Sequence, residues 1–168
     1  MKVISLIILI FFSFSSSFAE IAYIDINHIL NKSKVGISLN SHLKSLNDEF
    51  SVTYSKIETK IIKKEKEILA QKNIIKKNEF DKKLLVLSEE IKNYRKDKQI
   101  SKKNINNIQL ENTKKILKLL NPIITKYVEI NSISMVIPKK NIIVGKKNLD
   151  ITDQIIKLLN DNIKKINF

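Results

Sequence analysis

Apolar residues recur at helical spacing through the middle of this chain. The steps between them are three, four and seven residues, which is the pattern of a coiled-coil seam. A first seam consists of Leu39, Leu43, Leu46, Phe50, Tyr54, Ile57, Ile61, Ile68 and Ile75. A second consists of Phe80, Leu84, Leu87, Ile91, Tyr94, Ile105, Ile108, Ile116, Leu119, Ile123 and Tyr127. No glycine or proline interrupts the 85 residues from Ile37 to Asn121, so the pattern predicts a long helical region over residues 34–131.

The two seams fall out of phase across residues 73–78. We therefore expect a hairpin with its tip near 73–79 and two antiparallel helices of about 40 residues, each roughly 60 Å long. One continuous rod in a parallel coiled coil is the alternative. Lys64 and Lys98 occupy seam positions where an apolar residue would be expected, so the arm should be thin and flexible.

Short β-type runs lie at both ends of the helical region. Residues 21–26 alternate apolar side chains toward one face of a strand, and Asn27 is expected to cap a helical turn after it. After the arm, residues 133–137 and 142–144 predict two further strands around a turn.

Two helix starts are expected in the C-terminal third of the chain. Asn121-Pro122 has the residue types of an N-cap followed by the first helical position. The closing helix is expected to begin with Asp150 or Thr152 as its N-cap and with Asp153 in its first turn.

Predicted strands on both sides of a long helical region indicate an α+β fold that is mostly α. Residues 20–33 and 132–168 would form a small β-containing body, and residues 34–131 the arm. Such a body is marginal by surface-to-volume scaling and its strand edges are open, so we expect two or three copies to share a sheet or barrel. The residues expected at the contacts between copies are Ile24, Ile26, Val136, Ile137 and Ile143.

The first 19 residues have the layout of an export signal. Lys2 precedes an apolar run, Val3 to Phe14, and the segment ends in Ser17-Phe18-Ala19. The run is shorter than the roughly 20 residues of a transmembrane helix. We expect cleavage after Ala19 and a periplasmic location, with an uncleaved membrane anchor as the alternative.

Composition argues against an enzyme. The chain has two glycines, two prolines and no cysteine, which excludes a disulfide scaffold, a cysteine metal site and a glycine-rich phosphate loop. His28 and His42 lack spaced ligand partners, and the acid pairs Asp48-Glu49 and Glu89-Glu90 point in different directions on a helix. We expect no catalytic site, no metal and no cofactor.

The remaining functional signal is positive charge. The net charge is +14, from 31 basic and 17 acidic residues, and residues 34–121 hold 21 of the basic and 11 of the acidic ones. The arm residues expected to bind a partner or an anion diffusely are Lys63, Lys64, Lys66, Lys72, Ile74, Ile75, Lys76, Lys77, Phe80, Lys82, Lys83, Lys92, Arg95, Lys96, Lys98, Lys102 and Lys103. Such a surface attracts acidic polypeptides or anionic lipid; a merely solvated helix face is the alternative.

Four segments near the two ends of the exported chain carry a family resemblance. They are residues 21–36 (IAYIDINHILNKSKVG), Asn121-Pro122-Ile123, Ser134–Lys139 and Leu149–Asp153. In this order they resemble the Skp/OmpH family of periplasmic chaperones, while the arm matches only in helical character and length. The sequence departs from the family pattern at Asn131 and at Val144-Gly145.

The resemblance implies a homotrimer whose strands join in a central barrel, with three helical hairpins around a cavity. It implies an ATP-independent holdase that binds unfolded outer-membrane β-barrel proteins until they insert into the membrane. Client contacts would be spread over the arm, so no single site residue transfers. A periplasmic coiled-coil scaffold or adaptor remains an alternative, as does an envelope protein that binds anionic lipid or lipopolysaccharide. Nucleic acid is not expected, because the chain is exported and its basic stretch lacks interleaved aromatic residues.

Overall fold

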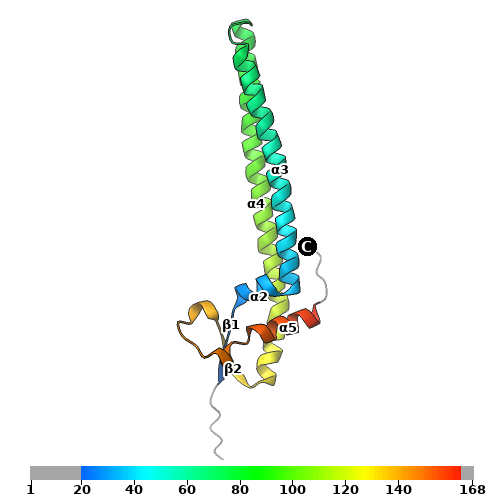
Figure 1. Ribbon diagram of the computed structural model, residues 1–168, viewed down its shortest axis with the longest axis vertical. Helices are drawn as coiled ribbons and strands as arrows, with labels where there is room; N and C mark the ends of the chain where they lie inside the picture. The colour runs from blue at the N-terminus through cyan, green and yellow to red at the C-terminus, as the bar shows by residue number, and fades with distance from the viewer. Residues whose placement is uncertain (1–19, 164–168) are drawn as a thin grey trace, which may run out of the picture.

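The computed structural model describes residues 20–163, which form a small body and a long projecting arm (Figure 1). The elements in chain order are β1 (Glu20–Ile24), α2 (Ile26–Lys32), α3 (Lys34–Ala70), α4 (Lys77–Ile130), β2 (Ile133–Pro138), the 3₁₀ turns η1 (Lys139–Asn141) and η2 (Lys147–Leu149), and α5 (Thr152–Asn162). The expected mostly helical α+β fold is confirmed. The expected export signal, residues 1–19, lies outside the described residues, as do residues 164–168 of the expected body.

The arm is an antiparallel hairpin in which α3 and the first part of α4 run side by side (Figure 1). The 37 residues of α3 make it about 55 Å long. The expected hairpin is present, and the continuous rod is wrong. The turn spans residues 71–76 rather than 73–79, because the segment from Lys77 onward is already helical: the N–H groups of Glu79 and Phe80 both donate to the Lys76 carbonyl oxygen at 3.0 Å.

Helix α4 passes through Asn121-Pro122 without ending, so the expected helix start at this dipeptide is wrong. Proline normally interrupts a helix because it lacks the N–H of the backbone bond. Here the neighbouring side chains of Ile116 and Leu120 are 0% and 1% exposed. Their burial in the core holds this segment of α4 helical.

The two strands β1 and β2 form a parallel sheet, with Tyr23 opposite Ile137. Parallel neighbours need a long crossover, and here the crossover consists of α2 and the whole arm. The expected third strand over residues 142–144 is wrong. The Ile142 N–H bonds back to the Lys139 carbonyl oxygen at 3.0 Å, and within residues 20–163 no strand lies beside this segment for it to pair with.

Polar side chains at two helix starts connect the ends of the chain. Asp25, rather than the expected Asn27, caps α2, and Ile26 belongs to that helix instead of the strand. Thr152 is the first residue of α5, not its N-cap, and its hydroxyl accepts the Asp25 N–H at 2.9 Å. The Asp150 carboxylate accepts the Thr152 N–H at 3.0 Å. Asp150 therefore makes the capping hydrogen bond, although it lies one residue before Ile151, the N-cap of α5.

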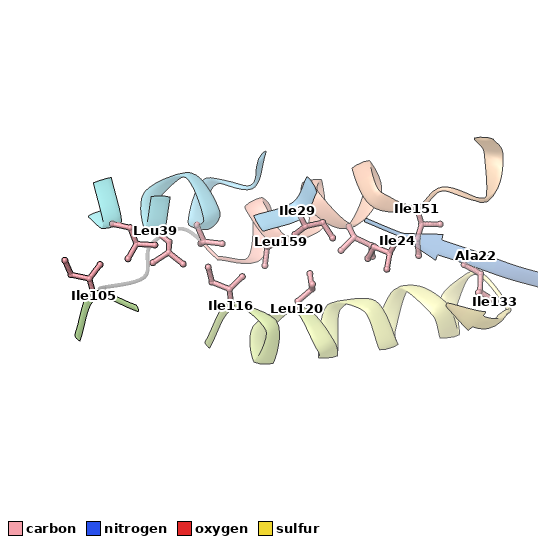
Figure 2. Close-up of a cluster of buried hydrophobic side chains, with 13 residues drawn as sticks. Ala22, Ile24, Ile29, Leu39, Ile105, Ile116, Leu120, Ile133, Ile151 and Leu159 are labelled. Carbon is pink, nitrogen blue, oxygen red and sulfur yellow. The ribbon is translucent and has the colours of Figure 1, made fainter. Parts of the chain in front are cut away.

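One hydrophobic core joins the body to the base of the arm (Figure 2). Helices α2, α4 and α5 contribute its most deeply buried side chains, which are Ile29, Ile116, Leu120, Ile155 and Leu159. The core continues into the arm through Leu39, Leu43 and Ile105. The arm is therefore anchored at its base by the same packing that stabilises the body.

Candidate functional site

The basic residues singled out in the sequence lie along the whole arm rather than at one pocket. Most of their side chains are exposed, and only Lys83 and Lys98 are half-buried. Among the apolar residues expected with them, Ile74 is exposed, whereas Ile75 and Phe80 are half-buried. The arm therefore offers an extended cationic surface with apolar positions near its tip.

Three of the predicted cations connect α3 to α4, and one of them, Lys102, donates to the Asn47 side-chain oxygen at 3.0 Å. The Lys64 Nζ lies 2.7 Å from the Glu90 carboxylate, and the Lys98 Nζ lies 2.8 Å from the Tyr94 hydroxyl and 3.7 Å from the Glu58 carboxylate. The hydrogen bond to Tyr94, with Glu58 close by, raises the pKa of Lys98. Lys64 and Lys98 occupy seam positions, so they replace apolar packing by cross-helix polar contacts, and exposed ion pairs of this kind contribute little to stability.

A groove of about 810 Å³ lies halfway along the arm. It combines two aromatic rings, those of Phe50 and Tyr94, with one carboxylate and several basic groups. Its other lining residues are Glu58, Arg95, Lys98, Gln99, Lys102, Lys103 and Asn106. The Lys98 Nζ lies 5.2 Å from the Tyr94 ring centroid and the Lys102 Nζ 5.6 Å from that of Phe50. An anionic segment would meet cations above an apolar floor here.

Several polar side chains that hold the hairpin together are not among the candidate residues expected from the sequence. Glu58 and Glu90 pair with seam lysines, and the hydroxyl groups of Tyr54 and Ser101 lie 2.7 Å apart across the two helices. These pairs could have been predicted from the sequence. In an antiparallel hairpin, facing residues lie at equal distances along the chain from the turn, and the two residues of each pair are equally distant from a point near position 77.

The residues expected at contacts between copies differ in their accessibility. Ile24 is only 3% exposed and packs in the core of its own chain. Ile26, Val136 and Ile137 are half-buried. Ile143 is fully exposed at 100%. Ile143 is therefore the member of this set that is most accessible to a second copy.

A polar network in the body involves Asp150. Burial alone would raise the pKa of the Asp150 carboxyl, but hydrogen bonds from Thr152 and Lys139 outweigh it and lower the pKa. The hydrogen bond to Asp150 also raises the pKa of Lys139, whose Nζ lies 3.0 Å from the carboxylate. Each member has a structural partner, so the network stabilises the junction between β1, β2 and α5.

Within residues 20–163 no three His, Asp or Glu side chains gather as metal ligands. His28 lies exposed on α2 and His42 half-buried on α3. No helix in this described part of the chain is long and apolar enough to cross a membrane. The arm presents cations, aromatic rings and exposed apolar side chains for non-covalent contacts.

Comparisons with known proteins agree with this geometry. The sequence profile of a family described as outer membrane protein (OmpH-like) matches residues 20–159. The crystal structure of a candidate outer membrane chaperone (OmpH-like) from Caulobacter crescentus CB15 superposes with a TM-score of 0.81 at 16% sequence identity, over 92% of this chain and 91% of that one. At this identity the likeness shows the fold alone. No protein of curated function matches the chain.

Proposed function

The chain belongs to the OmpH-like family of outer membrane proteins, and from this membership we propose that it is a periplasmic holdase chaperone. It would hold unfolded outer-membrane β-barrel proteins against its arm and keep them from aggregating until they insert into the membrane. The proposed activity uses neither ATP nor a cofactor, and it makes and breaks no covalent bond.

The observation that supports this role most strongly is the surface of the projecting hairpin. Its basic side chains are mostly exposed, and apolar side chains are exposed among them near the tip. Unfolded polypeptides differ in sequence, so a binder needs many weak contacts rather than one shaped pocket. Long-range attraction by the cations would bring an acidic client to the arm, and apolar contacts would then hold it.

A single hairpin cannot enclose a client, so the proposal includes assembly into a homotrimer with three arms around a cavity. Two features of the body favour it. Strand β2 pairs only with β1 in the described chain, which leaves an open edge, and Ile143 is fully exposed beside it in sequence. Open edges and exposed apolar residues are where protein copies associate.

A client-solubility assay tests the proposed function. An unfolded outer-membrane protein is diluted from urea with and without the processed protein, and light scattering is followed. We expect suppression of aggregation that weakens at high salt, because salt screens the arm cations. A coiled-coil scaffold would bind a defined partner without suppressing aggregation, and that result would refute the holdase role.

A charge-matched pair of variants locates the activity. Changing Lys66, Lys96 and Lys103 on the arm to Gln should weaken suppression. The same change at Lys140, Lys146 and Lys157 in the body removes equal charge and should have little effect. Equal losses in both variants would mean that net charge, rather than the arm, holds the client.

A further inference from the structure

An apolar groove lies in the body, where α5 crosses the C-terminal part of α4 (Figure 1). Its volume is about 820 Å³, which is within the range of sites that bind ligands in proteins. The side chain of Ile130, at one end of the groove, is 70% exposed. The floor consists of half-buried apolar side chains, which are Leu119, Ile123, Tyr127, Leu158 and Ile163. Apolar side chains gathered at a surface in this way mark an interaction site.

Each of the two helices lines this groove with a single face. The lining residues of α4 run from Leu119 to Ile130 at positions i, i+3, i+4, i+7, i+8 and i+11, and those of α5 from Gln154 to Asp161 at i, i+3, i+4 and i+7. Residues at this spacing lie on one side of a helix. The face of α4 is about 16 Å long. An apolar helix face normally packs against another part of the protein, and within residues 20–163 nothing covers these two faces.

The chain leaves α5 at the groove itself. Ile163, the last described residue, lines the groove, and its N–H donates to the Leu159 carbonyl oxygen at 2.9 Å. Its backbone is extended, with φ −117° and ψ 100°. Residues 164–168 (KKINF), which we name the tail, follow directly and lie outside the described residues. Five extended residues reach about 17 Å, so the tail is long enough to run along the whole face of α4.

The sequence of the tail alternates in the way that an occupant of this groove requires. Side chains two residues apart lie on the same side of an extended chain, so Ile166 and Phe168 share one side and Lys165 and Asn167 the other. Asp161 is the acidic group of the rim, at the end of α5, and it forms no ion pair with another described residue. The rest of the rim carries Lys126 and Lys157. The lysines of the tail therefore fit at the Asp161 end, and its apolar residues fit beyond them.

We propose that the tail occupies the groove of its own chain, with Ile166 and Phe168 on the apolar floor and Lys164 beside Asp161. A tethered segment of this length has an effective concentration of roughly millimolar order at its site. A free apolar segment must therefore displace the tail before it can bind there. The tail thus prevents unfolded polypeptide from binding to this side of the body, and the proposal does not depend on holdase activity.

The chain contains no tryptophan, so Phe168→Trp supplies a unique fluorescent probe of the tail. We expect its emission in the folded protein to be shifted to the blue of its emission in urea. Adding Ile130→Lys should remove the shift, because it places a charge in the groove and repels the lysines of the tail. Leu110→Lys is the matched control and should keep the shift, since Leu110 is also exposed on α4, at 54%, but does not line the groove. Helical circular dichroism checks that both variants are folded.

A second pair of variants tests the alternation with the dye ANS, whose fluorescence rises on exposed apolar surface. The processed protein is used, so that the apolar segment 3–14 cannot bind the dye. Ile166→Ser with Phe168→Ser should raise ANS fluorescence, because the groove loses its occupant. Lys165→Ser with Asn167→Ser changes the other side of the tail and should leave the fluorescence unchanged.

Three results would overturn the proposal. The first is emission of Phe168→Trp that is the same in the folded protein and in urea. The second is ANS fluorescence that rises equally in both serine variants or in neither. The third is a blue shift that disappears on dilution, because the groove would then bind the tail of a second copy rather than its own.

Discussion

Gly36 lies where the chain turns from α2 into α3. A Cβ atom at this position would be 2.0 Å from the Leu30 carbonyl oxygen, far inside the distance at which atoms can approach. Ser33, which is fully buried at the same elbow, accepts the Gly36 N–H at 3.1 Å and caps α3. The joint between body and arm is therefore packed too closely for any side chain at position 36.

We expect Gly36→Ala to destabilise the protein. Overpacking against backbone costs about 1–3 kcal/mol or more, which outweighs the gain of about 1 kcal/mol from the better helix propensity of alanine. Urea unfolding followed by circular dichroism measures the change. Ser38→Ala, at an exposed position of the same helix, is the control and should change stability by less than about 0.5 kcal/mol. Equal stability of the two variants would contradict the close approach.

Asp150 makes folding stability depend on pH. Its folded-state pKa is lowered from 3.8, so the carboxylate contributes stability above that value and loses it as the pH falls through the folded pKa. Asp150→Asn should therefore lower the urea midpoint near neutral pH, and the two proteins should converge once the pH falls below the folded-state pKa of Asp150. Asp153→Asn, at an exposed carboxylate in the first turn of α5, should lower the midpoint less. A constant difference between the wild type and Asp150→Asn at all pH values would rule out the mechanism.

Helices α3 and α4 are packed unevenly along their length. Between residues 51 and 104 the buried side chains are Tyr54, Ile61 and Leu87. The polar contacts of Lys64 and Lys98 fill seam positions between them. Few buried apolar contacts mean a low free energy of local opening. The outer part of the arm should therefore open more readily than its base.

Hydrogen exchange followed by mass spectrometry tests this difference. We expect backbone amides of residues 51–104 to exchange faster than those near Ile116 and Leu120, which are fully buried. Tyr54→Ala removes a large buried side chain and its contact with Ser101, so it should speed exchange in the outer arm further while amides of the body keep their protection. Uniform exchange along α4 would contradict the uneven packing.

The hairpin could be predicted from the sequence because the phase of the two apolar seams depends only on local spacing. The elements that were missed depend on what packs against them. Pro122 stays inside α4 because the core around Leu120 holds the helix, and a local rule cannot include that packing. Residues 142–144 have β-type composition, but a strand also requires a neighbour to pair with.

The sequence predicted which part of the protein carries the cations, but it did not predict which of them form ion pairs. Their number and position on the arm follow from counting lysines. That Lys64 and Lys98 hold the helices together, while Lys76 and Lys77 form no ion pair in the described chain, depends on register across the hairpin. The sequence also could not show that Ile24 is buried in the core of its own chain whereas Ile143 is fully exposed.

This distinction decides how assembly should be tested. Replacing Ile24 by Asp would place a carboxylate in the core and unfold the chain, so loss of a trimer would say nothing about contacts between copies. Ile143→Asp changes a side chain that is already in solvent. We expect the wild type to sediment as a trimer at micromolar concentration, and Ile143→Asp to sediment as a smaller species with unchanged helical circular dichroism.

Ile74→Asp provides the matched control, because Ile74 is 79% exposed and belongs to the turn between α3 and α4. This turn lies at the opposite end of the molecule from the sheet (Figure 1). It introduces the same charge in place of the same residue type. If copies associate through their bodies, this variant should remain a trimer. Dissociation of both variants would mean that the arms also join the copies. An intact Ile143→Asp trimer would remove residue 143 from the interface.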